Sequence, residues 1–179
     1  LNFGGSPYID LRVDFNSFLP EKLDKKIKEK AINYYLNKIN KNKEFHDKVE
    51  FNIIETCFDL DSEKKIRKFL SKKETKKYLK CLKDLTNDIF EQKKGSFLDE
   101  LSKINKLNSD IDSIKKSNLS EIHKIYFLTN SCKNLGTLPF SGLARSAFIA
   151  TKFLKSFFKK NIINEIDLEN FYSSINTIT

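Results

Sequence analysis

Arg145 is the residue whose surroundings are most suggestive of binding chemistry. It lies in GTLPFSGLARSAF, and it is one of only three arginines in a chain that has thirty lysines. We expect a helix to begin near Phe140 or Ser141, so that Arg145 falls in its first turns. Free backbone N–H groups at a helix start attract anions, and a guanidinium beside them suits a carboxylate or phosphate. With Ser141 and Gly142 leaving room for a ligand, Arg145 is a candidate substrate-binding residue.

The second candidate is Arg12, which stands between two aspartates in YIDLRVDF. Apolar and polar residues alternate there, a pattern typical of a half-buried strand over residues 8–15. The polar face of that strand, with Asp10, Arg12 and Asp14, offers a cation and carboxylates to an amino-acid zwitterion. The alternatives are structural. They are a local ladder of ion pairs along the strand, or a pairing of Arg145 with one of the two aspartates.

Catalytic and metal-binding residues are not predicted. His46 and His123 are far apart in the sequence and lack acidic or cysteine partners at the spacing of metal ligands. Glu50 and Glu55 would face opposite sides of a strand, which does not suit an acid–base pair. The sequence also lacks a Walker A loop, a dinucleotide-binding glycine pattern and a nucleophile elbow.

The elements that would position the candidate residues are mostly helices. Crowded β-branched and aromatic residues predict a second strand over residues 48–58, which could pair with the first. Ser71 and Glu74 form a capping-box pattern, and Gly136 is expected to cap the end of a helix. Helical spacing predicts helices over about 21–39, 71–93, 97–114, 120–135, 140–160 and 168–175. We therefore predict an α+β fold, a mostly helical single domain over residues 1–179 with a sheet of two or three strands.

The composition limits the environment and the partners. The formal charge is +9, but lysines alternate with acids, as in KLDKKIKEK, so we predict solvated helix faces and no nucleic-acid partner. No apolar run approaches the roughly 20 residues that span a bilayer, so we predict no membrane partner. Three widely spaced cysteines favour a reducing compartment, and we expect the cytoplasm. Because the chain contains no Met, we expect it to be an excised piece of a longer polypeptide.

Three stretches taken in order carry a resemblance to a known family. FGGSPYIDLRVDFNSFLP, HDKVEFNIIETCFD and GTLPFSGLARSAF resemble the central region of phosphotransferases related to phosphoenolpyruvate synthase and pyruvate phosphate dikinase. Within that group they are most similar to the L-glutamine kinases of capsule phosphoramidate biosynthesis. The similarity runs from Asn2 to the end, although the lysine-rich middle matches only in helical character.

The resemblance implies the role of one domain in a larger kinase. ATP and Mg²⁺ would bind an ATP-grasp domain, and a histidine on another domain would carry phosphate to the amide nitrogen of L-glutamine, with AMP and phosphate as the other products. This chain would hold the acceptor and would be inactive alone. The resemblance carries binding roles onto Arg12 and Arg145, and Asp10, Asp14 and Ser141 complete the predicted substrate-binding set. The alternatives are a docking module between the two other domains, or a freestanding basic helical domain that binds nucleic acid.

Overall fold

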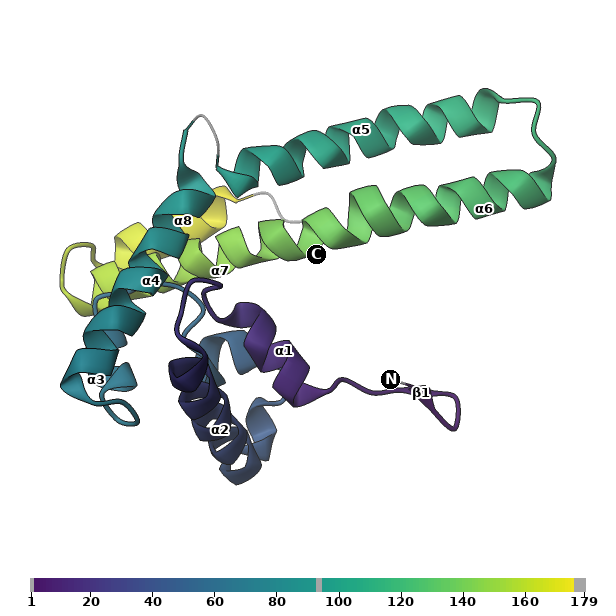
Figure 1. Ribbon diagram of the computed structural model, residues 1–179. Helices are drawn as coiled ribbons and strands as arrows, with labels where there is room; N and C mark the ends of the chain where they lie inside the picture. Colours follow the sequence, from purple (N-terminus) through teal and green to yellow (C-terminus); the bar gives the residue numbers. More distant parts are fainter. Residues whose placement is uncertain (1, 93–94, 176–179) are drawn as a thin grey trace. The chain divides into compact units, whose positions relative to one another are not determined.

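The computed structural model describes residues 2–92 and 95–175, and it is built almost entirely of helices (Figure 1). Two compact units divide the chain. Unit 1 comprises residues 1–85 and 148–179, and unit 2 comprises residues 86–147. The prediction of one domain over the whole chain stays a prediction. The helical elements are α1 (Leu11–Phe18), α2 (Lys25–Lys41), η1 (Lys43–Phe45), η2 (Val49–Ile53), α3 (Ser62–Ile66), α4 (Lys72–Phe90), α5 (Ser96–Lys116), α6 (Glu121–Ser131), η3 (Cys132–Thr137), α7 (Leu138–Lys159) and α8 (Glu165–Ser174).

The predicted α+β class is wrong, because the fold is all-α. Within the described residues, the strands are limited to β1 (Asn2–Phe3) and β2 (Ser6–Pro7), which pair in antiparallel fashion as a minimal hairpin. Gly4 and Gly5 connect them with φ angles of 58° and 84°. Residues other than glycine rarely adopt two successive positive φ angles, so this glycine pair accounts for the turn. A two-residue ladder has no face that could form one side of a core.

The strand predicted over residues 8–15 is wrong, because residues 11–15 lie in helix α1 and residues 8–10 belong to no regular element. Asp10 is the N-cap of α1, and its side chain accepts hydrogen bonds from the backbone N–H groups of Arg12 (2.9 Å) and Val13 (3.3 Å). The alternating apolar residues do not share a buried face, since Ile9 is 75% exposed and Val13 is 67% exposed. Phe15 is fully buried, and the helix packs against α2. The N-cap and one helical contact face therefore outweigh the alternating pattern.

The second predicted strand, residues 48–58, is also wrong. Val49–Ile53 forms the single wide turn η2, which closes with a hydrogen bond of 3.0 Å from the Ile54 N–H to the Val49 carbonyl. The residues that follow, up to Asp59, pair with no strand in the described part of the chain, yet most of them are buried. Burial of successive residues on both sides of the backbone explains why this segment is rich in β-branched residues without belonging to a sheet.

Unit 1 has one hydrophobic core, which α1, α2 and the first part of α4 share with the segment around η2. Tyr35 of α2 and Tyr78 of α4 are both fully buried there, with their hydroxyl oxygens 3.3 Å apart. Each hydroxyl thus keeps a polar partner in an apolar environment, as buried tyrosines require. The core side chains are Phe15, Leu19, Leu23, Ile27, Ala31, Ile32, Tyr35, Ile39, Val49, Ile53, Ile54, Ile66, Leu70, Tyr78 and Leu82.

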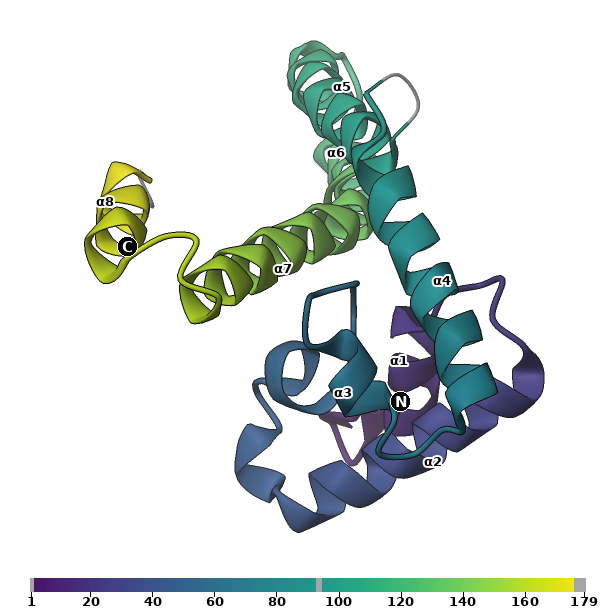
Figure 2. The ribbon, with the colours of Figure 1, turned by 90° about the vertical axis from the view of Figure 1, so that its left-hand side faces the viewer.

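Unit 2 is built around a hairpin of two antiparallel helices, α5 and α6, which lie side by side in both views (Figures 1 and 2). Helix α6 continues through the wide turn η3 directly into α7. The predicted capping role of Gly136 is therefore wrong, because the helical path does not end there. The turn runs close to α5 at Gly136, where an added Cβ would lie 3.3 Å from the side-chain atom Leu107 Cδ2.

The capping box predicted at the start of α4 is confirmed. Ser71 N–H donates to Glu74 Oε2 at 3.0 Å, and Glu74 N–H donates to Ser71 Oγ at 3.4 Å. The predicted helices over about 21–39, 97–114 and 168–175 correspond to α2, α5 and α8, with ends shifted by a few residues. Within the described residues, no helix combines the length and the apolar character needed to cross a membrane.

Candidate functional site

The predicted binding residues near the N-terminus are held by the first turns of α1. Asp10 is occupied in capping the helix, and Arg12 donates from Nη1 to Asn33 Oδ1 of α2 at 3.3 Å. Burial, and next the nearby Glu50, raise the pKa of the half-buried Asp14. Because residues two apart on a helix point in different directions, Arg12 and Asp14 do not form the shared polar face that a strand would give them.

Ser141 and Arg145 lie in the part of α7 that belongs to unit 2. The prediction that a helix begins at Phe140 or Ser141 is wrong, because α7 starts at Leu138 as a continuation of η3. The backbone at Arg145 is therefore inside a helix, and the free N–H groups invoked for anion binding are absent there. Ser141 is exposed, and its hydroxyl donates to the Leu138 carbonyl at 2.7 Å. The binding roles of Arg145 and Ser141 stay predictions. The free N–H groups of a helix start no longer support them.

A pocket lined by lysines is the strongest candidate site in the described residues, and it lies within unit 1. Its volume is about 240 Å³. It is formed by η2, the segment before α3, α3 itself and the last turns of α7. The lining residues are Phe51, Asn52, Asp59, Asp61, Lys65, Lys152, Lys155, Ser156 and Lys159. With four lysines against two aspartates, the lining has a formal excess of positive charge, so the pocket suits an anion. We refer to it below as the lysine pocket.

One wall of the lysine pocket is an ion-pair cluster around Lys65. The Lys65 ammonium lies 2.9 Å from Asp59 Oδ2 and 3.2 Å from Glu55 Oε2, and both carboxylates are almost entirely buried. Burial works against the charged form of Lys65, but Glu55 and Asp59 outweigh it and raise the pKa of the lysine. Burial raises the pKa of Glu55, against the pull of Lys152 and Lys65. This lysine is thus firmly held by its acidic partners.

The opposite wall is a single face of α7. Lys152, Lys155, Ser156 and Lys159 follow a spacing of three and four residues, which brings them to the same side of a helix. Lys152 is only 7% exposed and donates to the Ile54 carbonyl at 3.4 Å. The Lys155 ammonium lies 5.5 Å from the centre of the Phe51 ring, a cation–π contact. Lys159 donates to Asp61 Oδ2, which lowers the pKa of that carboxyl.

The sequence contains one signal for this pocket. In KFLKSFFKK, Lys152, Lys155 and Lys159 recur at helical spacing beside Ser156, between aromatic residues. In a chain with thirty lysines such a repeat is easily taken for a solvated helix face. The carboxylates that complete the cluster come from residues 55–61, far away in the sequence, so only the fold brings them together.

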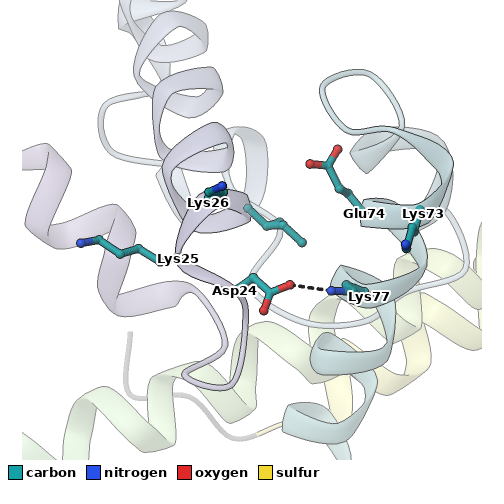
Figure 3. Close-up of a pocket in the computed structure, with 7 residues that line it drawn as sticks. Asp24, Lys25, Lys26, Lys73, Glu74 and Lys77 are labelled. Atoms are coloured by element: carbon teal, nitrogen blue, oxygen red, sulfur yellow. Dashed lines mark hydrogen bonds and ion pairs between the residues drawn. The ribbon is translucent and has the colours of Figure 1, made fainter.

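A second pocket, between the starts of α2 and α4, has a similar charge but a different character. Its volume is about 390 Å³, and Figure 3 shows Asp24 reaching across to Lys77, with 2.8 Å between Asp24 Oδ2 and Lys77 Nζ. Lys25 points away from the other labelled side chains. All four of its lysines are exposed, so solvent already screens them. We interpret this pocket as a brace between two helices. The lining residues are Asp24, Lys25, Lys26, Ile27, Lys73, Glu74 and Lys77.

Neither histidine lies at a pocket described above. His46 is exposed, with Nδ1 3.2 Å from the Lys43 carbonyl oxygen, and His123 is exposed, with Nδ1 2.7 Å from Ser120 Oγ at the start of α6. All three cysteines are free thiols. Burial raises the pKa of the Cys57 thiol, which makes it a weak nucleophile.

Comparison of the chain with protein families, with curated proteins and with solved structures gives no match. The function proposed below therefore depends on the chemistry of the site and on the sequence resemblance.

Proposed function

We propose that the chain is the acceptor-binding domain of an ATP-dependent phosphotransferase, and that the acceptor is L-glutamine. The order of three sequence stretches supports the family, the group related to phosphoenolpyruvate synthase and pyruvate phosphate dikinase. In this proposal, ATP and Mg²⁺ bind another domain, and a histidine of a further domain delivers the phosphoryl group. The free thiols and the absence of a spanning helix from the described residues are compatible with a cytoplasmic enzyme.

The observation that carries the proposal is the lysine pocket. A phosphoryl-transfer domain has to hold anionic reactants, and catalysis of such a transfer consists largely of positioning and charge stabilisation. Buried Lys152 and half-buried Lys65 supply positive charge where solvent screens it least. The buried carboxylates of Glu55 and Asp59 hold Lys65 in position, and the Ile54 carbonyl accepts a hydrogen bond from Lys152, so the charge is preorganised.

Within this proposal, Arg12 and Arg145 remain the candidate contacts for the acceptor amino acid. Calorimetric titration of the 179-residue chain with L-glutamine tests that assignment. Loss of one charge-assisted hydrogen bond corresponds to a roughly 10- to 150-fold weaker affinity. We expect Arg12→Ala or Arg145→Ala to show such a loss with an unchanged melting temperature.

The matched control is Arg67→Ala, which removes the remaining arginine at an exposed position beside α3. It should leave L-glutamine affinity unchanged. No detectable binding of L-glutamine to the wild-type chain would refute the acceptor assignment. Lower melting temperatures with unchanged affinity would mean that the arginines brace the fold.

A docking module is the second candidate function, and the apolar surface of α6 favours it. Ile122, Ile125 and Tyr126 are 78%, 64% and 63% exposed. They follow a spacing of three and four residues, which makes a continuous apolar stripe on one side of the helix. Large exposed apolar stripes commonly mark interaction surfaces.

A further inference from the structure

We propose that the lysine pocket binds a phosphate-type dianion, held between Lys152 and Lys155 of α7. This inference rests on the proposed function only in taking the pocket as the site of the anionic reactants. It assigns the phosphoryl group to this pocket, and it leaves the carboxylate of the acceptor to other residues.

Two of the four lysines at the pocket are not paired with any carboxylate that the structure describes. Lys65 is paired with Glu55 and Asp59, and Lys159 is paired with Asp61. Among the described residues, neither Lys152 nor Lys155 has a carboxylate within ion-pair distance. Their polar and aromatic contacts are the Ile54 carbonyl and the Phe51 ring. Two positive charges at the pocket are therefore not directly neutralised.

Burial of Lys152 adds to the positive potential of the pocket. Lys152 is 7% exposed, and an ammonium removed from water at that depth is costly unless a counter-charge compensates it. Glu55 supplies part of that compensation, since Lys152 lowers the pKa of this carboxyl against the larger effect of burial. On the same side of unit 1, burial is the main cause that lowers the pKa of Lys38. Glu55 raises this pKa, whereas Lys65, Lys68 and Lys152 lower it further. Positive charge is thus crowded there, which favours an anion.

The charge and the volume of the pocket fit a small dianion. A monocarboxylate would neutralise one of the two lysines, whereas a phosphate dianion would neutralise both. An ammonium has three N–H donors, so Lys152 can keep its bond to Ile54 and still donate to a phosphate oxygen. Ser156 and Asn52 add a hydroxyl and an amide to the lining. The volume of about 240 Å³ lies below the roughly 300–1,000 Å³ of pockets for drug-sized ligands, so a small anion fits.

Two sources could supply this chemistry, free inorganic phosphate and a phosphate monoester such as AMP. The test is calorimetric titration of the 179-residue chain at low salt and about pH 8, where a monoester carries its second charge. Phosphate, AMP, acetate and L-glutamine are the four titrants. We expect phosphate to bind and acetate to bind at least tenfold more weakly. AMP binding more tightly than phosphate would identify a monoester as the source, and equal or weaker binding would identify free phosphate.

The variants are Lys152→Gln and Lys155→Gln, with Lys25→Gln as the control in the second pocket. Each pocket variant should weaken phosphate binding by roughly 10- to 150-fold, and the control should change it by less than about twofold. Lys155 is exposed, so Lys155→Gln should leave the chain folded. This variant still tests the inference if Lys152→Gln, at a buried position, unfolds the chain. Equal affinity for acetate and phosphate, no phosphate binding, or equal effects of Lys155→Gln and Lys25→Gln would overturn the inference. Binding of L-glutamine without phosphate would refute only this inference, and binding of phosphate without L-glutamine would refute only the proposed acceptor.

Discussion

Glu74 performs two tasks at the start of α4. Its Oε2 accepts hydrogen bonds from the backbone and hydroxyl of Ser71 at 3.0 and 2.7 Å, and its Oε1 lies 2.6 Å from the Lys30 ammonium. Lys30 first, and then Ser71, lower the pKa of Glu74 from 4.5 to about 2. One carboxylate therefore closes the helix start and ties α4 to α2 within unit 1.

This lowered pKa predicts how the contribution of Glu74 depends on pH. A carboxyl whose pKa is lower in the folded state stabilises the fold above pH 4.5 and loses that effect as the pH falls through about 2. Gln at this position can still complete a capping box, so Glu74→Gln removes mainly the charge. We expect Glu74→Gln to lower the free energy of unfolding at about pH 7, and we expect its difference from wild type to disappear as the pH falls to about 2 and below.

Urea unfolding at several pH values measures this difference, and Lys30→Gln is the matched control. The hydrogen bond from Lys30 is the largest cause of the lowered pKa of Glu74. Lys30→Gln should therefore show most of the pH-dependent change in the free energy of unfolding that Glu74→Gln shows. A Glu74→Gln effect that stayed constant from neutral to acidic pH would contradict the assignment.

Local residue patterns were predictable where their partners lie within a few positions. The Ser71–Glu74 capping box involves near neighbours, and the sequence alone was sufficient to predict it. The lysine pocket was not predictable, because Asp59 and Lys65 line the same pocket as Lys152 and Lys155 only through the fold. The position of Arg145 within its helix was misjudged for a related reason, since no sequence signal showed that α6 would continue through η3 into α7.

At the scale of elements, the junction between α4 and α5 depends on Gly95. This buried glycine is the N-cap of α5, and its N–H donates to the Glu91 carbonyl at 2.8 Å. An added Cβ would lie 2.6 Å from the carbonyl oxygens of both Ile89 and Glu91. Those are backbone atoms at the end of α4, so they cannot move without disturbing the helix.

We therefore expect Gly95→Ala to destabilise unit 2 by about 1–3 kcal/mol, the range for forcing an extra methyl group into a packed site. Gly136→Ala is the matched control, because its nearest neighbours are the side-chain atoms Leu107 Cδ2 and Cys132 Sγ at 3.3 and 3.8 Å. Alanine also has the higher helix propensity, so the control should be neutral or slightly stabilising. Thermal unfolding followed by far-UV circular dichroism compares the two variants. Equal melting temperatures would show that the junction tolerates a side chain.

Element type was predictable for the helices and was misjudged at both supposed strands. In YIDLRVDF, alternation favoured a strand, but Asp10 caps a helix and only Phe15 of the apolar set is buried. In residues 48–58, β-branched residues are buried on both sides of an irregular segment, without a partner strand. Alternation did not report a buried face in the first segment, β-branched content reported burial in the second, and neither pattern reports whether another strand is available for pairing.

At the scale of the whole chain, the two units differ in how much they bury. Five residues of α2 are buried in unit 1, whereas no residue of α5 or α6, both described in full, is buried. The free energy of local opening follows buried contacts, so the α5–α6 hairpin should open at lower cost than α2. This difference also matters for function. A helical hairpin that is weakly stabilised by itself and has an apolar stripe on α6 is suited to gain stability from a partner.

Hydrogen exchange measured by mass spectrometry tests this expectation on the isolated 179-residue chain. Amides in the middle of α5 and α6 should exchange roughly tenfold or more faster than those of α2, which corresponds to about 1.4 kcal/mol in opening free energy. Ile125→Ser, on the exposed stripe of α6, is the informative variant, because it should leave exchange unchanged if the stripe contacts only water. Slow exchange of α6 that becomes fast in this variant or on dilution would contradict the expectation. It would mean that the stripe is covered by a second copy of the chain, and it would favour the docking function over the acceptor site.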